Sequence, residues 1–139
     1  MIILDTNVLS EMLRPDPEPR VRQWLNDQPR AAVFTTTITR GEIYYGIRVL
    51  PAGKRRDRLW NAAIKILDME MAGQVLAFDS LAADEFAEIS ATKRTSGRPI
   101  AQFDAQIAGI TRSRGAQLAT RNVSDFHACG FDVINPWGK

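Results

Sequence analysis

The sequence contains one cysteine, Cys129, and one histidine, His127, among 139 residues. A single cysteine cannot form an internal disulfide, and it is more often a small buried hydrophobic residue than a nucleophile. The scarcity of both residue types argues against a zinc site, a cysteine–histidine nucleophile and a serine–histidine–aspartate triad. If the protein is an enzyme, carboxylates must carry its chemistry.

Long apolar runs are also missing from the sequence. No stretch approaches the roughly 18 consecutive apolar residues that a membrane-spanning helix needs, so no membrane association is expected. Asp5 interrupts the opening apolar run and no basic leader precedes it, which is unlike a secretory signal. We therefore expect a cytoplasmic protein. With 45% hydrophobic residues, the chain is expected to fold as one domain over residues 1–139.

Neither sign of charge is in large excess. The 18 lysines and arginines exceed the 16 acids by a net charge of +2. The basic run at residues 54–58 is typical of a solvated helix face. Most of the basic residues are arginines, which suit bidentate contacts with phosphate. The balance permits a nucleic-acid partner without requiring one.

Short apolar segments alternate with segments of helical periodicity. Strands are expected at residues 2–4, 32–36, 75–78, 116–120 and 131–134, and helices at 8–13, around 21–25, and at 40–50, 59–67, 80–90 and 100–110. Strands that alternate with helices predict an α/β fold in which a parallel sheet is covered on both faces.

A carboxylate stands at the end of the first expected strand, where Asp5 is followed by Thr6 and Asn7. Ligands bind beyond the carboxyl ends of strands in open α/β sheets. A buried carboxylate is costly unless it is paired or bound to a metal, so Asp5 is a candidate site residue. The alternative is that Asp5 caps the next helix, although Thr6 and Asn7 are better placed for capping.

Three further acids, Glu42, Asp104 and Asp125, follow other elements in comparable positions. Glu42 also fits a capping box with Thr39, and Asp104 fits an acid favoured by a helix dipole. Asp125, like Asn122, can cap a short helical turn. If the four carboxylates converge on one cleft, they would hold Mg²⁺ or Mn²⁺.

Asp79 also ends an expected strand, and we expect it to be the N-cap of the helix beyond. A receiver-like module would use it as a phosphoacceptor. Such a module needs an acidic pair near the first strand and a lysine after the fifth, where this chain has Asn7 and Asn135. The sequence therefore favours the structural role for Asp79.

The order of the acids is more specific than any one of them. An aspartate follows the first strand, and a glutamate opens the helix after the second strand. Another aspartate opens a later helix, and the motif Thr-x-Asn-x-x-Asp-Phe follows the fourth strand. In this order the chain resembles the PIN-domain ribonucleases and, among them, the VapC-type toxins of bacterial toxin–antitoxin pairs. The resemblance covers nearly the whole chain and is carried by residues 3–7, 37–46, 104–108, 118–126 and 134–137.

The resemblance implies a small three-layer α/β/α sandwich that cleaves RNA with Mg²⁺ or Mn²⁺. Asp5 and Asp104 carry over as the principal metal ligands, and Glu42 as the third acid. Many relatives have aspartate where this chain has Asn122, so either Asn122 or Asp125 fills the fourth position. Asparagine is a weaker, neutral oxygen ligand, which puts a second metal in question.

The expected chemistry is attack by a metal-activated water in line with a phosphodiester, leaving a 5′-phosphate and a 3′-hydroxyl. Glu42 would position or deprotonate that water, and Thr6 and Thr120 would add hydrogen bonds around the site. A PIN-like domain that binds RNA or protein without cutting is the alternative. Such a binder would have no need of Asp5, Glu42 and Asp104, which argues against it.

The resemblance also implies two protein partners: a cognate antitoxin, whose tail lies over a groove beside the active site, and a second copy of the chain in a homodimer. Apolar residues of the early helices are candidates to line that groove: Val8, Leu9, Met12 and Trp24. An ordinary place in the core is the alternative for each of them.

Overall fold

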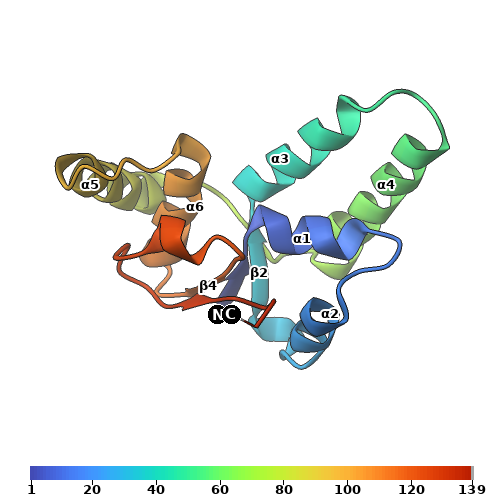
Figure 1. Ribbon diagram of the computed structural model, residues 1–139, viewed down its shortest axis with the longest axis horizontal. Coiled ribbons are helices and arrows are strands. Elements are labelled where there is room, and N and C mark those ends of the chain that lie inside the picture. The colour runs from blue at the N-terminus through green and yellow to red at the C-terminus, as the bar shows by residue number, and fades with distance from the viewer. Residues whose placement is uncertain (139) are drawn as a thin grey trace.

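The computed structural model describes residues 1–138 and has a five-stranded sheet at its centre (Figure 1). The strand order is β3-β2-β1-β4-β5, and every neighbouring pair is parallel. The strands are β1 (Ile2–Leu4), β2 (Val33–Thr36), β3 (Val75–Leu76), β4 (Gln117–Ala119) and β5 (Val133–Ile134). The predicted parallel sheet is therefore confirmed, although most strands are shorter than predicted. All the strands end at the same edge of the sheet.

Each strand except the last leads into helical segments, as the alternating pattern predicts. The α-helices are α1 (Thr6–Leu13), α2 (Pro19–Asn26), α3 (Thr37–Arg48), α4 (Lys54–Ile64), α5 (Ser80–Thr95) and α6 (Gln102–Ser113). Helix α4 continues as a π-helical segment, η2 (Lys65–Glu70), and two short 3₁₀ turns are η1 (Arg30–Ala32) and η3 (Val123–Phe126). Within residues 1–138, no helix has the length and apolarity needed to cross a membrane.

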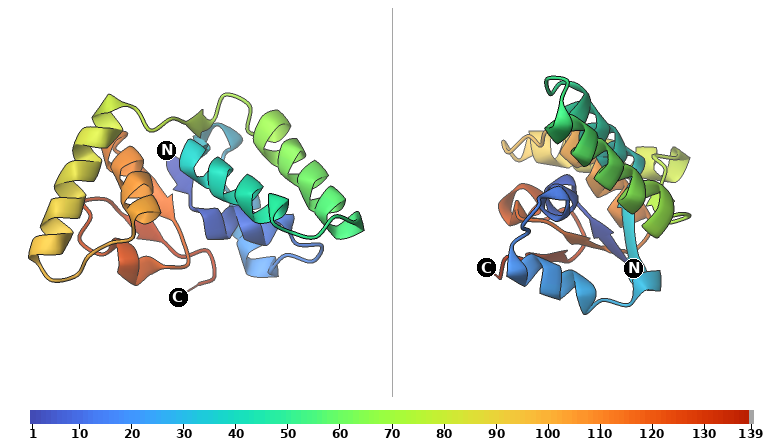
Figure 2. Two further views of the ribbon diagram at one scale, coloured as in Figure 1. Left: turned by 90° about the horizontal axis from the view of Figure 1, so that it is seen from above. Right: turned by 90° about the vertical axis from the view of Figure 1, so that its right-hand side faces the viewer.

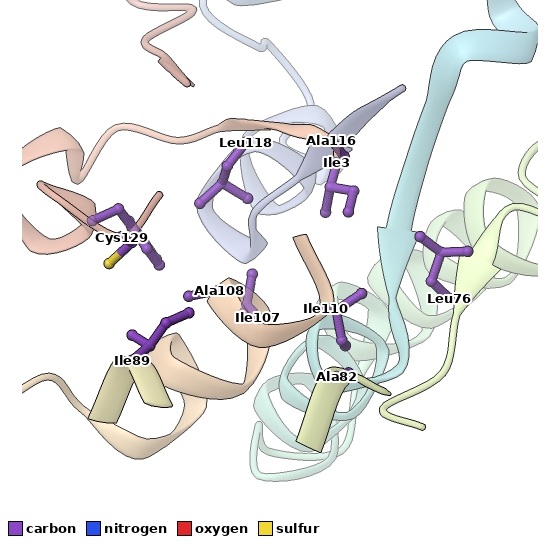
Figure 3. Close-up of a cluster of buried hydrophobic side chains, with 11 residues drawn as sticks. Ile3, Leu76, Ala82, Ile89, Ile107, Ala108, Ile110, Ala116, Leu118 and Cys129 are labelled. Atoms are coloured by element: carbon purple, nitrogen blue, oxygen red, sulfur yellow. The ribbon is translucent and has the colours of Figure 1, made fainter. Parts of the chain in front are cut away.

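Alternating side chains of the strands build two separate hydrophobic cores. Ile3 and Leu118 pack with α5 and α6 on one face, whereas Leu4 and Ala119 pack with α1, α3 and α4 on the other. Figure 2 shows these two groups of helices on opposite sides of the strands, and Figure 3 shows the first core around Ile3 and Leu118. The expected three-layer α/β/α sandwich is confirmed. Cys129 is buried in the first core, as expected of a lone cysteine.

Helix α6 packs against α5 with almost no room between them. A Cβ atom added to Gly109 would lie 2.6 Å from the carbonyl oxygen of Ala82 and 3.0 Å from Cβ of Phe86. Real Cβ atoms do not approach backbone oxygens so closely. A residue without a side chain is therefore needed at this point of α6, and the close contact sets the distance between α6 and α5.

The positions at which the helices begin show that two of the predicted N-caps are wrong and that a third is right. Helix α3 begins at Thr37, and its N-cap is Thr36, whose hydroxyl accepts from the Thr39 N–H at 3.1 Å. The capping box of Thr39 and Glu42 is therefore wrong, because β2 leads directly into the helix and the cap falls one turn earlier. Asp79 is the N-cap of α5, as predicted, and accepts from the Ala82 N–H at 3.0 Å.

The cap of α1 is also different from the prediction. Asp5 itself is the N-cap, and its carboxylate accepts from the Thr6 N–H at 2.8 Å. Thr6 and Asn7 lie inside the first turn, since the helix starts immediately after β1. Asp5 therefore both ends the central strand β1 and caps the helix that follows it.

Candidate functional site

Three of the four candidate acids line one cavity of about 570 Å³. Asp5 reaches it from the end of β1, Glu42 from the second turn of α3 and Asp104 from the first turn of α6. These elements are adjacent because β1 and β2 pair in parallel and α6 packs beside α3. The parallel sheet thus brings together acids that lie far apart in the sequence.

Asp5 is only 3% exposed and has a hydrogen-bond donor at each carboxylate oxygen. Oδ1 accepts from the Thr6 N–H at 2.8 Å, and Oδ2 accepts from the Thr120 hydroxyl at 2.7 Å. Burial raises the pKa of Asp5, and the two hydrogen bonds oppose that rise by stabilising the charged form. The site holds this carboxylate in one orientation.

The Thr120 hydroxyl has all its hydrogen-bonding capacity in use. It donates to Asp5 and accepts from Asn7 Nδ2 at 3.3 Å and from the Asn122 N–H at 3.0 Å. A hydroxyl has one proton and two lone pairs, so its orientation is fixed by three partners. The expected supporting place of Thr120 near the acids agrees with this arrangement. Sequence reasoning treated Asn7 only as a turn or cap residue, although its position two residues after Asp5 was a usable signal.

Substituting Thr120 by valine is expected to destabilise the fold by about 1–3 kcal/mol, because it leaves buried polar groups without partners. Serine at the same position keeps the hydroxyl and is the matched control. Urea denaturation of the two variants and the wild type measures the difference. Equal stability of T120V and T120S would show that the hydroxyl contributes nothing.

The hydroxyls of Thr6 and Thr39 hold the Glu42 carboxylate in place. Its Oε1 accepts from the Thr6 hydroxyl at 2.8 Å, and the hydroxyls of Thr6 and Thr39 lie 3.0 Å apart. Because the single proton of Thr6 is used on Glu42, Thr39 must be the donor in the second contact. Thr39 is fully buried. The sequence pattern predicts a cap at Thr39 and does not reveal its place in this chain of hydrogen bonds.

Asp104 carries the most perturbed carboxylate of the site. Its pKa is raised to about 6, first by partial burial and then by the negative charges of Asp5, Asp125 and Glu42. The ion pairs found within residues 1–138 include none of these four acids. The site therefore concentrates negative charge that the protein itself does not neutralise.

Asn122 and Asp125, the two candidates for the fourth ligand of the metal, lie in different cavities. Asn122 lines the same cavity as Asp5, and its side chain does not cap η3. Asp125 is exposed on η3 and shares a neighbouring cavity of about 210 Å³ with Asp104, Lys93 and Arg98. Its charge still acts on the site, because it raises the pKa values of both Asp5 and Asp104.

The donor set suits a hard divalent cation. Three carboxylates face one open cavity, and Mg²⁺ usually takes one or two carboxylates and keeps several waters. Within the described part of the chain, no group of three or more acidic, cysteine or histidine side chains is arranged to hold a metal ion by itself. The arrangement therefore fits an ion that is completed by water and substrate, and it does not fit a fully protein-ligated ion.

A second, mostly apolar cavity of about 420 Å³ lies between α1, α2, η2 and the β2–β3 edge. Leu9 and Met12, two of the residues proposed for a groove on the early helices, line this cavity. The expectation for Val8 is wrong, because Val8 is fully buried in the core beneath. Trp24 packs against the same core and is not part of the cavity wall.

Comparisons with known proteins agree on one family. Residues 2–130 match the PIN domain. The VapC ribonuclease Y4jK of Sinorhizobium fredii is 39% identical over 137 residues, which cover 99% of this chain and 98% of the relative. Toxin FitB of Neisseria gonorrhoeae is 36% identical, with 99% of each chain covered. The solved structure of FitAB bound to an IR36 DNA fragment superposes with a TM-score of 0.92 at 36% identity, covering 100% of this chain and 97% of that one.

Proposed function

Because the chain belongs to the PIN-domain family and, within it, to the VapC-type toxins, we propose that it is a metal-dependent endoribonuclease whose site is built by Asp5, Glu42 and Asp104. The observation that carries the site assignment is the convergence of these acids in one cavity, where within residues 1–138 none of them forms an ion pair. RNA has a phosphodiester backbone, and its cleavage by water is the reaction that such a site serves.

Asp5 and Asp104 would hold Mg²⁺ or Mn²⁺, with Asn122 or Asp125 at the fourth position. When bound, the cation supplies a Lewis acid that lowers the pKa of water and offsets charge at the phosphodiester. The hydrogen bonds from Thr6 and Thr120 orient the Asp5 carboxylate and oppose the rise in its pKa that burial causes. Binding a cation would also relieve the repulsion that raises the pKa of Asp104.

Glu42 is the residue that positions and deprotonates the attacking water. Its Oε1 is fixed by the Thr6 hydroxyl, which is itself fixed by Thr39. Within residues 1–138, Oε2 makes no hydrogen bond, so this oxygen is free to accept one from water. Attack by water leaves a 5′-phosphate and a 3′-hydroxyl and does not use the 2′-hydroxyl of RNA.

The chain is the toxin of a toxin–antitoxin pair, and a cognate antitoxin is its protein partner. We propose that an apolar segment of the antitoxin occupies the cavity lined by Leu9 and Met12. A homodimer is also proposed, since Tyr45 in the last turn of α3 and Val49, the residue that caps its C-terminus, are 70% and 62% exposed. The proposed location is the cytoplasm, where the RNA substrate is found.

The experiment that tests the function is cleavage of a mixed cellular RNA pool by the purified protein with Mg²⁺, with Mn²⁺ and with EDTA. We expect discrete cuts that depend on the cation and vanish in EDTA. Mapping the new ends identifies the substrate and should find 5′-phosphates. Cuts that persist in EDTA, or that leave 2′,3′-cyclic phosphates, would contradict the proposed chemistry.

A copurified antitoxin is controlled by mass spectrometry of the preparation and by refolding the chain alone. If the antitoxin-free protein binds RNA and the cation but does not cut, the chain is a binding module. That result would overturn the enzymatic proposal and leave the fold assignment untouched.

A further inference from the structure

Arg121 is a cation in the lining of the acidic cavity, and no step of the proposed function uses it. It follows Thr120 at the end of β4 and lines the same cavity as Asp5, Glu42 and Asp104. Within residues 1–138, its guanidinium makes no ion pair and no hydrogen bond; only its backbone N–H is engaged, by Asn7 Oδ1 at 3.3 Å. An arginine thus stands beside uncompensated acids without pairing with any of them.

The guanidinium is instead stacked on an aromatic ring. Its central carbon lies 4.9 Å from the ring centroid of Trp137, which also lines the cavity. A cation over an indole face is attracted by the ring quadrupole, and tryptophan is the best residue for this contact. Stacking orients the guanidinium plane while leaving its N–H donors available at the edge.

Trp137 is itself held in place. Its backbone N–H donates to Asn135 Oδ1 at 2.9 Å, and its carbonyl oxygen accepts from Arg20 Nη1 at 3.1 Å. Its half-buried indole packs against the core on the α1 side of the sheet. The ring is therefore a fixed platform, and fixing Arg121 in advance reduces the entropy lost when the arginine binds a ligand.

A second arginine of the same cavity offers a direct comparison. Arg14 is paired with Glu11 at 3.0 Å, and Glu11 is buried and also accepts from the Glu18 N–H at 2.9 Å. The charge of Arg14 is therefore neutralised within the protein. Arg121 carries the same charge at the same cavity, and its charge is available to an external anion.

We propose that Arg121 binds a backbone phosphate of single-stranded RNA beside the cleaved bond, and that Trp137 is the positioning residue that presents it. This inference rests on the proposed ribonuclease function. A guanidinium fork matches two phosphate oxygens, and a fixed cation offsets the repulsion between the acids and the RNA backbone. Single-stranded RNA is the fitting substrate, because its backbone can bend into an open cavity as a duplex cannot.

The test measures binding of a short fluorescein-labelled single-stranded RNA by anisotropy, in EDTA and over a range of salt concentrations. R121Q is expected to weaken binding roughly tenfold and to lower the slope of log K against log[salt] by about 0.7, the value for one lost contact to a single strand. R14Q, the matched control, should change the slope much less. If R121Q and R14Q have equal effects, or if R121Q leaves the slope unchanged, the assignment is wrong.

The variants W137F and W137L test whether the Trp137 ring presents Arg121 to the RNA. Their melting temperatures are measured first, to show that both variants are folded. Phenylalanine keeps an aromatic face and should bind RNA nearly as the wild type does. Leucine keeps the packing without the face and should lose part of the affinity that R121Q loses. Additive effects of W137L and R121Q, or equal binding by both Trp137 variants, would show that Trp137 has only a structural role.

Cleavage kinetics separate this inference from the function on which it rests. R121Q is expected to raise KM with little change in kcat, because a backbone contact is made equally in the bound and transition states. Normal cleavage by R121Q with an unchanged KM would overturn the phosphate contact and leave the ribonuclease in place. If the wild type binds RNA through Arg121 but does not cleave it, the ribonuclease function is wrong and the phosphate contact stands.

Discussion

Replacing Asp104 by asparagine is expected to abolish RNA cleavage and to make the metal-free protein more stable. The carboxylate contributes to holding the cation, whose stabilisation of the transition state is several kcal/mol, so the rate should fall roughly 10³-fold or more. Asp104 accepts no side-chain hydrogen bond within residues 1–138 and is repelled by Asp5, Asp125 and Glu42. Removing its charge therefore relieves strain without breaking a contact. Single-turnover cleavage and thermal unfolding in EDTA measure the two effects.

Asp5 gives the opposite stability result with the same loss of cleavage. Asp5→Ala removes the N-cap of α1 and the buried hydrogen bond from Thr120, so the metal-free fold should lose about 1–2 kcal/mol. Relief of repulsion offsets only part of this loss. Cleavage that survives in both variants would show that the catalytic cation binds elsewhere.

Cation binding supplies an independent readout of the same assignment. Mg²⁺ or Mn²⁺ should raise the melting temperature of the wild type, because a ligand that binds only the folded state stabilises it. The rise should be much smaller in D104N and in Asp5→Ala. Equal rises in the three proteins would place the bound cation outside this cavity.

The pH dependence of stability in EDTA should show the raised pKa of Asp104. Its pKa is about 6 in the folded protein and near the ordinary aspartate value of 3.8 when unfolded, so the folded state binds a proton more tightly. Stability from this group is therefore present below about pH 4 and is lost as the pH rises to about 6 and above. D104N should lack this part of the decline. A wild-type stability curve parallel to that of D104N would contradict the raised pKa.

Replacing Gly109 by alanine is expected to destabilise the fold by about 1–3 kcal/mol, because the added methyl group overpacks the contact between α5 and α6. The new Cβ would lie 2.6 Å from a backbone oxygen, which cannot move aside as a flexible side chain can. Gly46→Ala is the matched control. It lies within α3 with nothing inside 4 Å of the added Cβ, so helix propensity should stabilise that variant by up to about 1 kcal/mol.

Urea denaturation of the two alanine variants should thus give changes of opposite sign. The clash also moves α6, which carries Asp104, so cleavage by G109A is expected to fall at temperatures where the variant remains folded. A stabilised G109A would show that α5 and α6 are less closely packed than the structure has them.

The three layers of the fold could be predicted because the sequence patterns that mark strands and helices are local. Apolar runs ending in turn residues marked the five strands, and apolar periodicity marked the helices between them. Parallel strands end at one edge, so acids that follow strands or open helices are expected there. That reasoning singled out Asp5, Glu42, Asp104 and Asp125 as candidates, and the fold brings the first three of them to one cavity.

The partners of those acids were decided only by tertiary structure. The hydroxyl that holds Asp5 comes from Thr120, and the one that holds Glu42 comes from Thr6, across 115 and 36 residues of sequence. Residue spacing suggested a nearer partner for Glu42 in the capping box with Thr39, because local patterns do not contain strand register or the point at which a strand becomes a helix. The stacking of Arg121 on Trp137 has the same origin. Local sequence determines which groups stand at the sheet edge, and long-range packing determines which of them meet, because hydrogen bonds and stacking depend on distances that only the folded chain sets.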